Sequence, residues 1–161
     1  MSYPCEMEQV SPDSAEGRMV LEAYFRDIMR RHYARDVTRD EVDAAMKVEP
    51  SSDLRPPGGA FFVARHGGAV VGCAGLRLIT AGIGEVTRVF VRPEARRRGV
   101  GQHLMEAVED AARGQRVTRL RLDTGSHLPE ARQLYLKNGY REVPAFNQGR
   151  LSDQWYEKTL G

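Results

Sequence analysis

The chain has 161 residues, a length that suits one domain built around a single hydrophobic core. Its 24 basic and 22 acidic residues leave a net charge of +2, so no overall positive field favours binding to nucleic acid or to a membrane. Two widely separated cysteines argue against a disulfide framework or a zinc site. No membrane span or signal peptide is predicted. We therefore expect one domain over residues 1–161, located in the cytoplasm.

The first third of the chain predicts a short strand and two helices. Residues 5–10 can form the strand. A helix reaching about residue 32 is predicted from apolar side chains that recur at helical spacing, namely Val20, Leu21, Tyr24, Phe25, Ile28 and Met29. Capping-box spacing at Thr38 predicts a second helix over residues 38–48. Residues 49–59 are rich in Pro and Gly and are expected to form a loop.

The rest of the chain predicts six strands and two helices. The expected strands are residues 60–65, 69–79, 85–91, 117–123, 140–143 and 154–160. The first three are consecutive and antiparallel, and the connection to the fourth is long enough for a right-handed parallel crossover through a helix. The last helix is expected between Pro129 and Gly139. The predicted order is β-α-α-β-β-β-α-β-α-β-β, an α/β (α+β) fold with a mostly antiparallel sheet flanked by helices.

The junction Arg-Arg-Arg-Gly-Val-Gly at residues 96–101 joins a strand to an amphipathic helix. A helix N-terminus leaves its first N–H groups unpaired and carries a partial positive charge. Here no carboxylate occurs from Ala95 to Met105, the glycines leave the approach open, and the arginines add charged donors. The pattern favours a bound phosphate group, although a solvated turn or a weak nucleic-acid patch would have a similar sequence.

Two motifs in this chain resemble those of one enzyme family. Residues 96–101, Arg-x-x-Gly-x-Gly between strand and helix, resemble the acetyl-coenzyme A signature of the GCN5-related N-acetyltransferase (GNAT) superfamily. Residues 131–140, Ala-Arg-Gln-Leu-Tyr-Leu-Lys-Asn-Gly-Tyr, resemble that family's Ala-x-x-Leu-Tyr motif followed by Gly-Phe or Gly-Tyr. The resemblance extends over residues 72–143, and the motifs occur in the family's order.

The resemblance implies acetyl-coenzyme A as cosubstrate and no metal. Its pyrophosphate is expected on main-chain N–H groups from Arg97 to Gln102, with one or two of the three arginines in contact. Family members also pair main-chain groups of the fourth strand, here Phe90 and Val91, with the pantetheine arm, although these residues could simply pack in the core. The implied cofactor-binding residues are Phe90, Val91, Arg96, Arg97, Arg98, Gly99, Val100, Gly101 and Gln102.

The resemblance also implies catalytic roles for Glu85 and Tyr135. Attack by an amine requires a base, because an ammonium with a pKa of roughly 10 has no free lone pair. Glu85 begins the fourth strand, where several family members place this base, directly or through water. Tyr135 aligns with the tyrosine that protonates the leaving thiolate, and the Val91 N–H would stabilise the oxyanion. The alternatives are a surface glutamate and a tyrosine packed beside Leu134.

The chain departs from the family pattern at Leu128, where many relatives carry an asparagine that contacts pantetheine. Asp123, Thr124 or Ser126 could replace that contact, or it could be absent. The histidines His32, His66, His103 and His127 have no metal-binding spacing.

The predicted reaction is acetyl transfer from acetyl-coenzyme A to a primary amine of a small molecule, by direct attack in a ternary complex. The alternatives are a peptide or protein N-acetyltransferase, a non-catalytic acyl-coenzyme A sensor, and an RNA-binding protein. No nucleic acid or membrane partner is expected, and a homodimer is left open. Specificity is expected in the first two helices and in the loops at residues 49–59 and 144–153.

Overall fold

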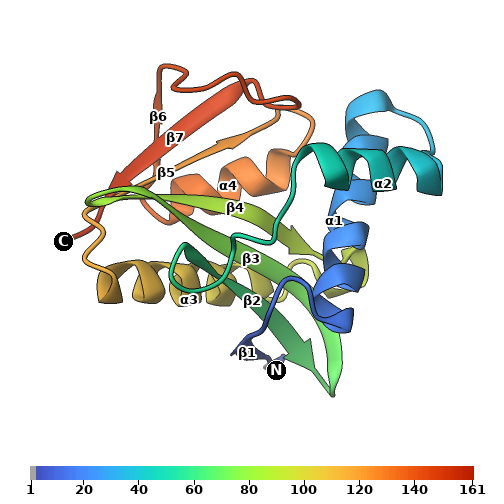
Figure 1. Cartoon of the computed structure of the whole chain (residues 1–161), viewed down its shortest axis with the longest axis horizontal. Helices are drawn as coiled ribbons and strands as arrows, with labels where there is room; N and C mark the ends of the chain where they lie inside the picture. The colour runs from blue at the N-terminus through green and yellow to red at the C-terminus, as the bar shows by residue number, and fades with distance from the viewer. Residues whose placement is uncertain (1–2) are drawn as a thin grey trace.

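The computed structural model describes residues 3–161, and its elements follow the predicted order (Figure 1). The strands are β1 (Glu6–Gln9), β2 (Gly59–His66), β3 (Ala69–Thr80), β4 (Ile83–Val91), β5 (Arg119–Thr124), β6 (Arg141–Val143) and β7 (Gln154–Thr159). The α-helices are α1 (Ala15–Tyr33), α2 (Arg39–Val48), α3 (Val100–Gly114) and α4 (Pro129–Lys137). A 3-10 turn, η1 (Pro93–Ala95), follows β4 and was not predicted. Its first residue is a proline, whose fixed φ suits that position.

The seven strands form one sheet in the order β1-β2-β3-β4-β5-β7-β6. β4 and β5 are parallel, whereas the other neighbouring pairs are antiparallel. The predicted antiparallel run of β2, β3 and β4 is confirmed, and so is the parallel crossover through α3. The predicted class, a mostly antiparallel sheet flanked by helices, is therefore also confirmed (Figure 1).

β4 and β5 diverge soon after they begin to pair. Their ladder covers only Ile83–Glu85 opposite Arg119–Arg121. Farther along, β5 stays paired with β7, and β4 stays paired with β3 as far as Val91. Within the described chain, the edge of β4 that faces β5 therefore has no strand partner from Val86 onwards. Unpaired main-chain groups on such an edge can bind an extended ligand.

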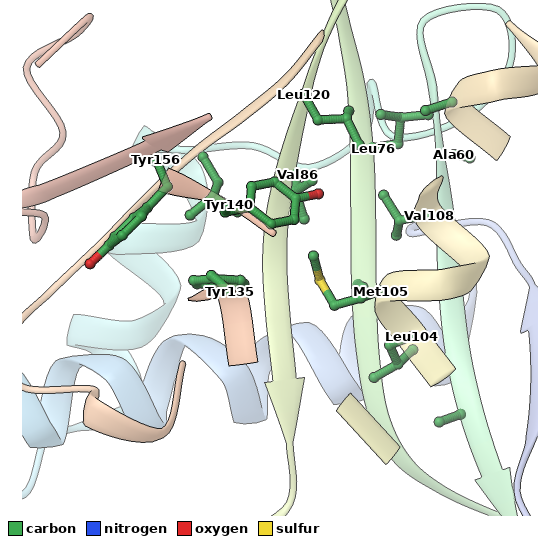
Figure 2. Close-up of a cluster of buried hydrophobic side chains, with 14 of the residues drawn as sticks. Ala60, Leu76, Val86, Leu104, Met105, Val108, Leu120, Tyr135, Tyr140 and Tyr156 are labelled. Carbon is green, nitrogen blue, oxygen red and sulfur yellow. The ribbon is translucent and has the colours of Figure 1, made fainter. Parts of the chain in front are cut away.

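Helices cover both faces of the sheet. Side chains alternate between the faces along each strand, so a strand can contribute apolar side chains to the core on either face. On one face, Phe61 and Val63 of β2 pack against Val20 of α1. On the other face, Figure 2 shows α3 and α4 side chains packed over the sheet: Leu104, Met105, Val108 and Tyr135 beside Leu76 and Val86. β4 thus lies between two cores, which fix the position of its open edge.

Local sequence signals set two of the helix boundaries as predicted. The Thr38 hydroxyl accepts a hydrogen bond from the Glu41 N–H at 3.1 Å, and the Glu41 carboxylate accepts one from the Thr38 N–H at 3.0 Å. Gly139 follows α4 with φ 89°, a left-handed conformation that glycine adopts easily. None of the described helices is both long and apolar enough to cross a membrane.

Candidate active site

Two adjoining cavities follow the open edge of β4. The α3 cavity, of about 470 Å³, is lined by the end of β4, the start of α3 and side chains of α1 and α4. The β4 cavity, of about 420 Å³, is lined by residues 85–89 of β4, the end of β5 and the loop before β7. The residues that line both cavities are Ile28, Val89, Leu128 and Ala131. A molecule bound in the α3 cavity can therefore extend along β4 into the β4 cavity.

The first turn of α3 borders the α3 cavity with unpaired amides. Among residues 3–161, no protein acceptor bonds the main-chain N–H groups from Arg97 to Gln102, and the first turn contains no acidic residue. Gly99 has φ 83°, and a side chain there would meet nothing within 4 Å. A Cβ atom at Gly101 would lie 3.1 Å from Leu134 Cδ2, so this glycine allows α3 to approach α4 closely. Free amides and the helix dipole together favour an anion.

The neighbouring residues Val100 and Gln102 contribute main chain, not side chains, to this turn. The Val100 side chain is 1% exposed and belongs to the core under the sheet. The Gln102 side-chain amide exchanges hydrogen bonds of 2.9 Å with the Asn138 side chain. Their predicted contact with an anion can therefore involve only their amides.

The first and third of the three consecutive arginines are held by other parts of the protein. Arg96 lines the α3 cavity, but its Nε donates to the Val91 carbonyl oxygen at 3.0 Å and its Nη2 to Asp27 at 3.2 Å. Arg98 lies outside the lining of both cavities, with its guanidinium 5.2 Å from the centre of the Tyr3 ring. Neither guanidinium is freely available to a ligand in the α3 cavity.

Arg97 and Lys137 are the cations of the α3 cavity that form no ion pair within the described part of the chain. The acidic side chains of the cavity are already neutralised: Arg31 pairs with Glu130 and also with Asp27, at 3.6 Å. The hydrogen bond from Arg31 lowers the pKa of Glu130. The cavity therefore carries an excess of positive charge, next to the free amides of α3.

Phe90 and Val91 direct their main-chain groups to opposite sides of β4. The Arg92 N–H donates to the Val71 carbonyl oxygen at 2.8 Å, and Phe90 lies opposite Cys73. Because bonded and non-bonded pairs alternate along an antiparallel ladder, Phe90 exchanges hydrogen bonds with β3, whereas Val91 faces the open edge. The Val91 N–H has no acceptor among the described residues. Val91 therefore offers a free donor, whereas Phe90 contributes to the cavity wall.

Glu85 lines the β4 cavity where β4 and β5 diverge. Its carboxylate accepts a hydrogen bond from Arg77 Nη1 at 3.0 Å, and its side chain is 15% exposed. Arg77 also donates two hydrogen bonds to Asp53, at 2.6 and 3.1 Å. Burial raises the pKa of Glu85 and the charge of Asp123 adds to this rise, whereas the charge of Arg77 opposes it. A carboxylate with a raised pKa is a better proton acceptor near neutral pH.

Two tyrosines line the β4 cavity with hydroxyl groups that have no hydrogen-bond partner among residues 3–161. Tyr135 of α4 is 5% exposed and packs near Tyr140 and Tyr156, at ring-centre distances of 6.1 and 6.3 Å (Figure 2). Burial raises its pKa, so its hydroxyl keeps its proton at neutral pH. Burial also raises the pKa of Tyr24 on α1 to about 12. Sequence reasoning assigned Tyr24 only to the apolar face of its helix, because periodicity does not reveal which apolar residues border a cavity.

Arg88 is a second residue of the β4 cavity that the sequence did not reveal. It is 9% exposed, and its φ of 57° lies in the left-handed region although it belongs to a strand. The register between β3 and β4 shifts at this point. In the sequence, Arg88 occupies an ordinary polar position of an alternating strand, and only the pairing with β3 reveals the bulge. No sequence signal could have placed its side chain in the cavity.

The end of β5 and the loop that follows complete the β4 cavity. Asp123 accepts hydrogen bonds from Ser152 at 2.5 Å and from Asn147 at 3.1 Å. Ser126 bonds Asp153 instead and does not line either cavity. Leu128 lines both cavities as an apolar side chain, so a polar contact at that position is absent. Asp123 is therefore a carboxylate that forms no ion pair among residues 3–161, and Arg150 of the loop before β7 lines the same end of the cavity.

The chain carries a recognisable family pattern over most of its length. The sequence model of the acetyltransferase (GNAT) family matches residues 21–140. The chain belongs to this family. The resemblance found in its two motifs is thus confirmed.

Relatives of this GNAT protein include enzymes with named activities. It is 41% identical over 94 residues to the IAA acetyltransferase of Azospirillum brasilense, and the alignment covers 58% of this chain and 61% of that protein. The chain thus spans about three fifths of the length of this relative. The name describes the activity of the Azospirillum brasilense protein.

Solved structures share the GNAT fold. A Klebsiella pneumoniae protein, provisionally described as an acyl-CoA N-acyltransferase, has a TM-score of 0.78 at 28% identity, over 99% of this chain and 100% of the other. The PaiA N-acetyltransferase of Thermoplasma acidophilum, solved in complex with coenzyme A, has a TM-score of 0.75 at 19% identity, over 98% and 99% of the two chains. At this low identity, the match to the Thermoplasma protein shows a shared fold alone. Within residues 3–161 of this GNAT chain, no three His, Cys, Asp or Glu side chains are grouped to hold a metal ion.

Proposed function

We propose that this GNAT protein transfers the acetyl group of acetyl-coenzyme A to the primary amine of a small molecule, with both substrates bound at once. The observation that carries this proposal is the continuity of the two cavities along the open edge of β4. The α3 cavity has the free amides and unpaired cations that a diphosphate requires. The Thermoplasma neighbour, which shares the fold, was solved in complex with coenzyme A, and this supports coenzyme A as a ligand of the proposed site.

The β4 cavity is the proposed site of the amine. Its volume of about 420 Å³ lies within the roughly 300–1,000 Å³ typical of small-molecule sites. Glu85 and Asp123 place carboxylates in its lining, which favour an ammonium group before the reaction. A small amine fits a cavity of this volume better than a long peptide, the other acceptor considered.

Glu85 and Tyr135 are the proposed proton-transfer residues. Glu85 takes a proton from the ammonium, directly or through water, which frees the lone pair for attack. The Val91 N–H stabilises the carbonyl oxygen as negative charge develops on it. Tyr135 retains its proton at neutral pH and donates it to the thiolate that leaves. Direct attack is favoured because neither cavity has a cysteine among its described lining residues, and because Cys73 is fully buried and burial raises the pKa of its thiol.

Thiol release from acetyl-coenzyme A, measured with a panel of amino acids, polyamines, aminoglycosides and short peptides, tests this proposal. We expect release with small amines, and we expect Tyr135→Phe to slow it by about 100-fold with little change in acetyl-coenzyme A affinity. The matched control is Tyr24→Phe, which removes the other free hydroxyl of the cavity.

Two results would contradict these assignments. A sensor without catalytic activity would bind acetyl-coenzyme A but release no thiol with any amine. If Tyr24→Phe slowed the reaction and Tyr135→Phe did not, the proton donor would be the tyrosine of α1.

A further inference from the structure

Arg88 places a buried positive charge in the lining of the β4 cavity. Each of its three nitrogens donates to a neutral oxygen: Nε to Ser51 Oγ at 3.1 Å, Nη1 to Thr87 Oγ1 at 2.9 Å and Nη2 to the Glu49 carbonyl oxygen at 3.2 Å. The guanidinium also lies 5.1 Å from the centre of the Phe25 ring. Three of the five N–H donors of an arginine are thus used, and two remain.

No carboxylate in the described structure neutralises this charge. Arg88 forms no ion pair among residues 3–161, although four acidic residues line the same cavity. Asp53 and Glu85 pair with Arg77, Asp123 is bonded by uncharged side chains, and Glu49 meets Arg88 through its main chain. A buried charge normally has an ionic partner, because desolvation of an unpaired ion is strongly unfavourable.

Arg88 and Asp123 line the same cavity but are held by different segments of the chain. Arg88 is held by residues that follow α2, namely Glu49 and Ser51. Asp123, at the end of β5, is held by Asn147 and Ser152 from the loop before β7. A ligand that spans the cavity can therefore meet both of these charged groups.

We infer that the acceptor carries a carboxylate group that pairs with Arg88, in addition to the amine that is acetylated. This inference rests on the proposed function and narrows its substrate class to amino acids and related zwitterions. An arginine fork with two free donors suits a carboxylate, and the amine then lies toward Glu85 and Asp123. The strained backbone at Arg88 is consistent with a ligand-binding position, since such strain concentrates at functional sites.

The test compares amino acids with their carboxamides, which have the same amine and side chain but no negative charge. The quantity measured is the ratio of kcat/KM for acid to kcat/KM for amide, in the wild type and in Arg88→Gln. Intrinsic differences in amine reactivity cancel when the two ratios are divided. We expect Arg88→Gln to lower the ratio by about 10- to 100-fold, the range expected for loss of a hydrogen-bonded charge contact. Arg88→Lys, which keeps the charge but not the fork, should lower it less.

A purely structural role for Arg88 would slow both acceptors equally and leave the ratio unchanged, which would overturn the inference. The matched control is Arg150→Gln, since Arg150 is an exposed arginine of the same cavity. If that variant loses the acid preference and Arg88→Gln keeps it, the carboxylate site lies at the rim instead. Coenzyme A affinity, measured for each variant, verifies that the fold is intact.

A binding measurement separates failure of this inference from failure of the proposed function. Calorimetry of the coenzyme A complex with N-acetylamino acids and with their amides requires no turnover. Tighter binding of the acids, lost in Arg88→Gln, supports the carboxylate site even if no amine reacts. Acetylation of amines with no preference for acids would instead preserve the proposed function and refute the inference.

Discussion

At the residue scale, burial and neighbouring charges shift the pKa of Glu85 in opposite directions. Burial and the nearby Asp123 raise its pKa, and Arg77 lowers it through an ion pair of 3.0 Å. Asp53 shares the same arginine, which weakens the hold of Arg77 on Glu85. Arg77 thus orients the carboxylate without fully removing its affinity for a proton, as a base requires.

The first prediction at this scale concerns Glu85→Gln. The acid limb of the kcat/KM profile should follow the pKa of Glu85, above the usual range of a glutamate, with the rate rising as pH increases through it. Glu85→Gln should lose about 100-fold or more in kcat/KM and should also lose this limb. Rates measured between pH 4 and about 9 would test both effects. A variant that keeps the limb would show that another group is the base.

Thermal unfolding supplies the control for this variant. A carboxyl group whose pKa is raised by folding stabilises the protein below its unfolded pKa, and this contribution is lost as pH rises through the folded pKa. At neutral pH, ionised Glu85 therefore opposes folding through its burial. Glu85→Gln should consequently unfold at the same temperature as the wild type, or at a higher one. A marked loss of stability would indicate a structural role.

The site residues that could be predicted from the sequence lie within local motifs. Glu85 and Tyr135 both line the β4 cavity, as expected of residues that act on one substrate. Arg88 and Tyr24 were not predicted as residues of the site. The position of Arg88 depends on a β-bulge, and that of Tyr24 depends on how α1 crosses the sheet. The unequal environments of the three arginines likewise depend on Tyr3 and Asp27, which are distant in sequence.

At the scale of elements, the strand-turn-helix unit of β4, η1 and α3, residues 83–114, contains all the predicted cofactor residues. Its strand and helix were predictable, because alternation and helical periodicity are local properties. The separation of β4 from β5 was not, since it depends on how the whole of β5 pairs with β7. The open edge that the site requires is thus a property of the sheet.

A matched pair of charge reversals tests this unit. Arg97→Glu places an acid beside the free amides of α3, whereas Arg98→Glu makes the same change next to Tyr3, outside the cavity. We expect Arg97→Glu to weaken acetyl-coenzyme A binding by about 10-fold or more, and Arg98→Glu to weaken it much less. Calorimetry at low and high salt would measure both. Equal losses in the two variants would mean that binding depends only on the net charge of this region and that Arg97 does not contact acetyl-coenzyme A directly.

At the scale of the whole molecule, α1, β4, α3 and α4 are brought together around the α3 cavity. A cofactor bound there contacts elements from both halves of the chain and should stabilise all of them together. Acetyl-coenzyme A at about 100 times its dissociation constant should stabilise the fold by about 2.7 kcal/mol, which corresponds to a rise of about 5 to 11 °C in Tm for a domain of this size. Pantetheine lacks the diphosphate and should raise Tm much less at equal concentration. Equal shifts from the two ligands would place the binding energy along β4 and contradict the role of the α3 amides.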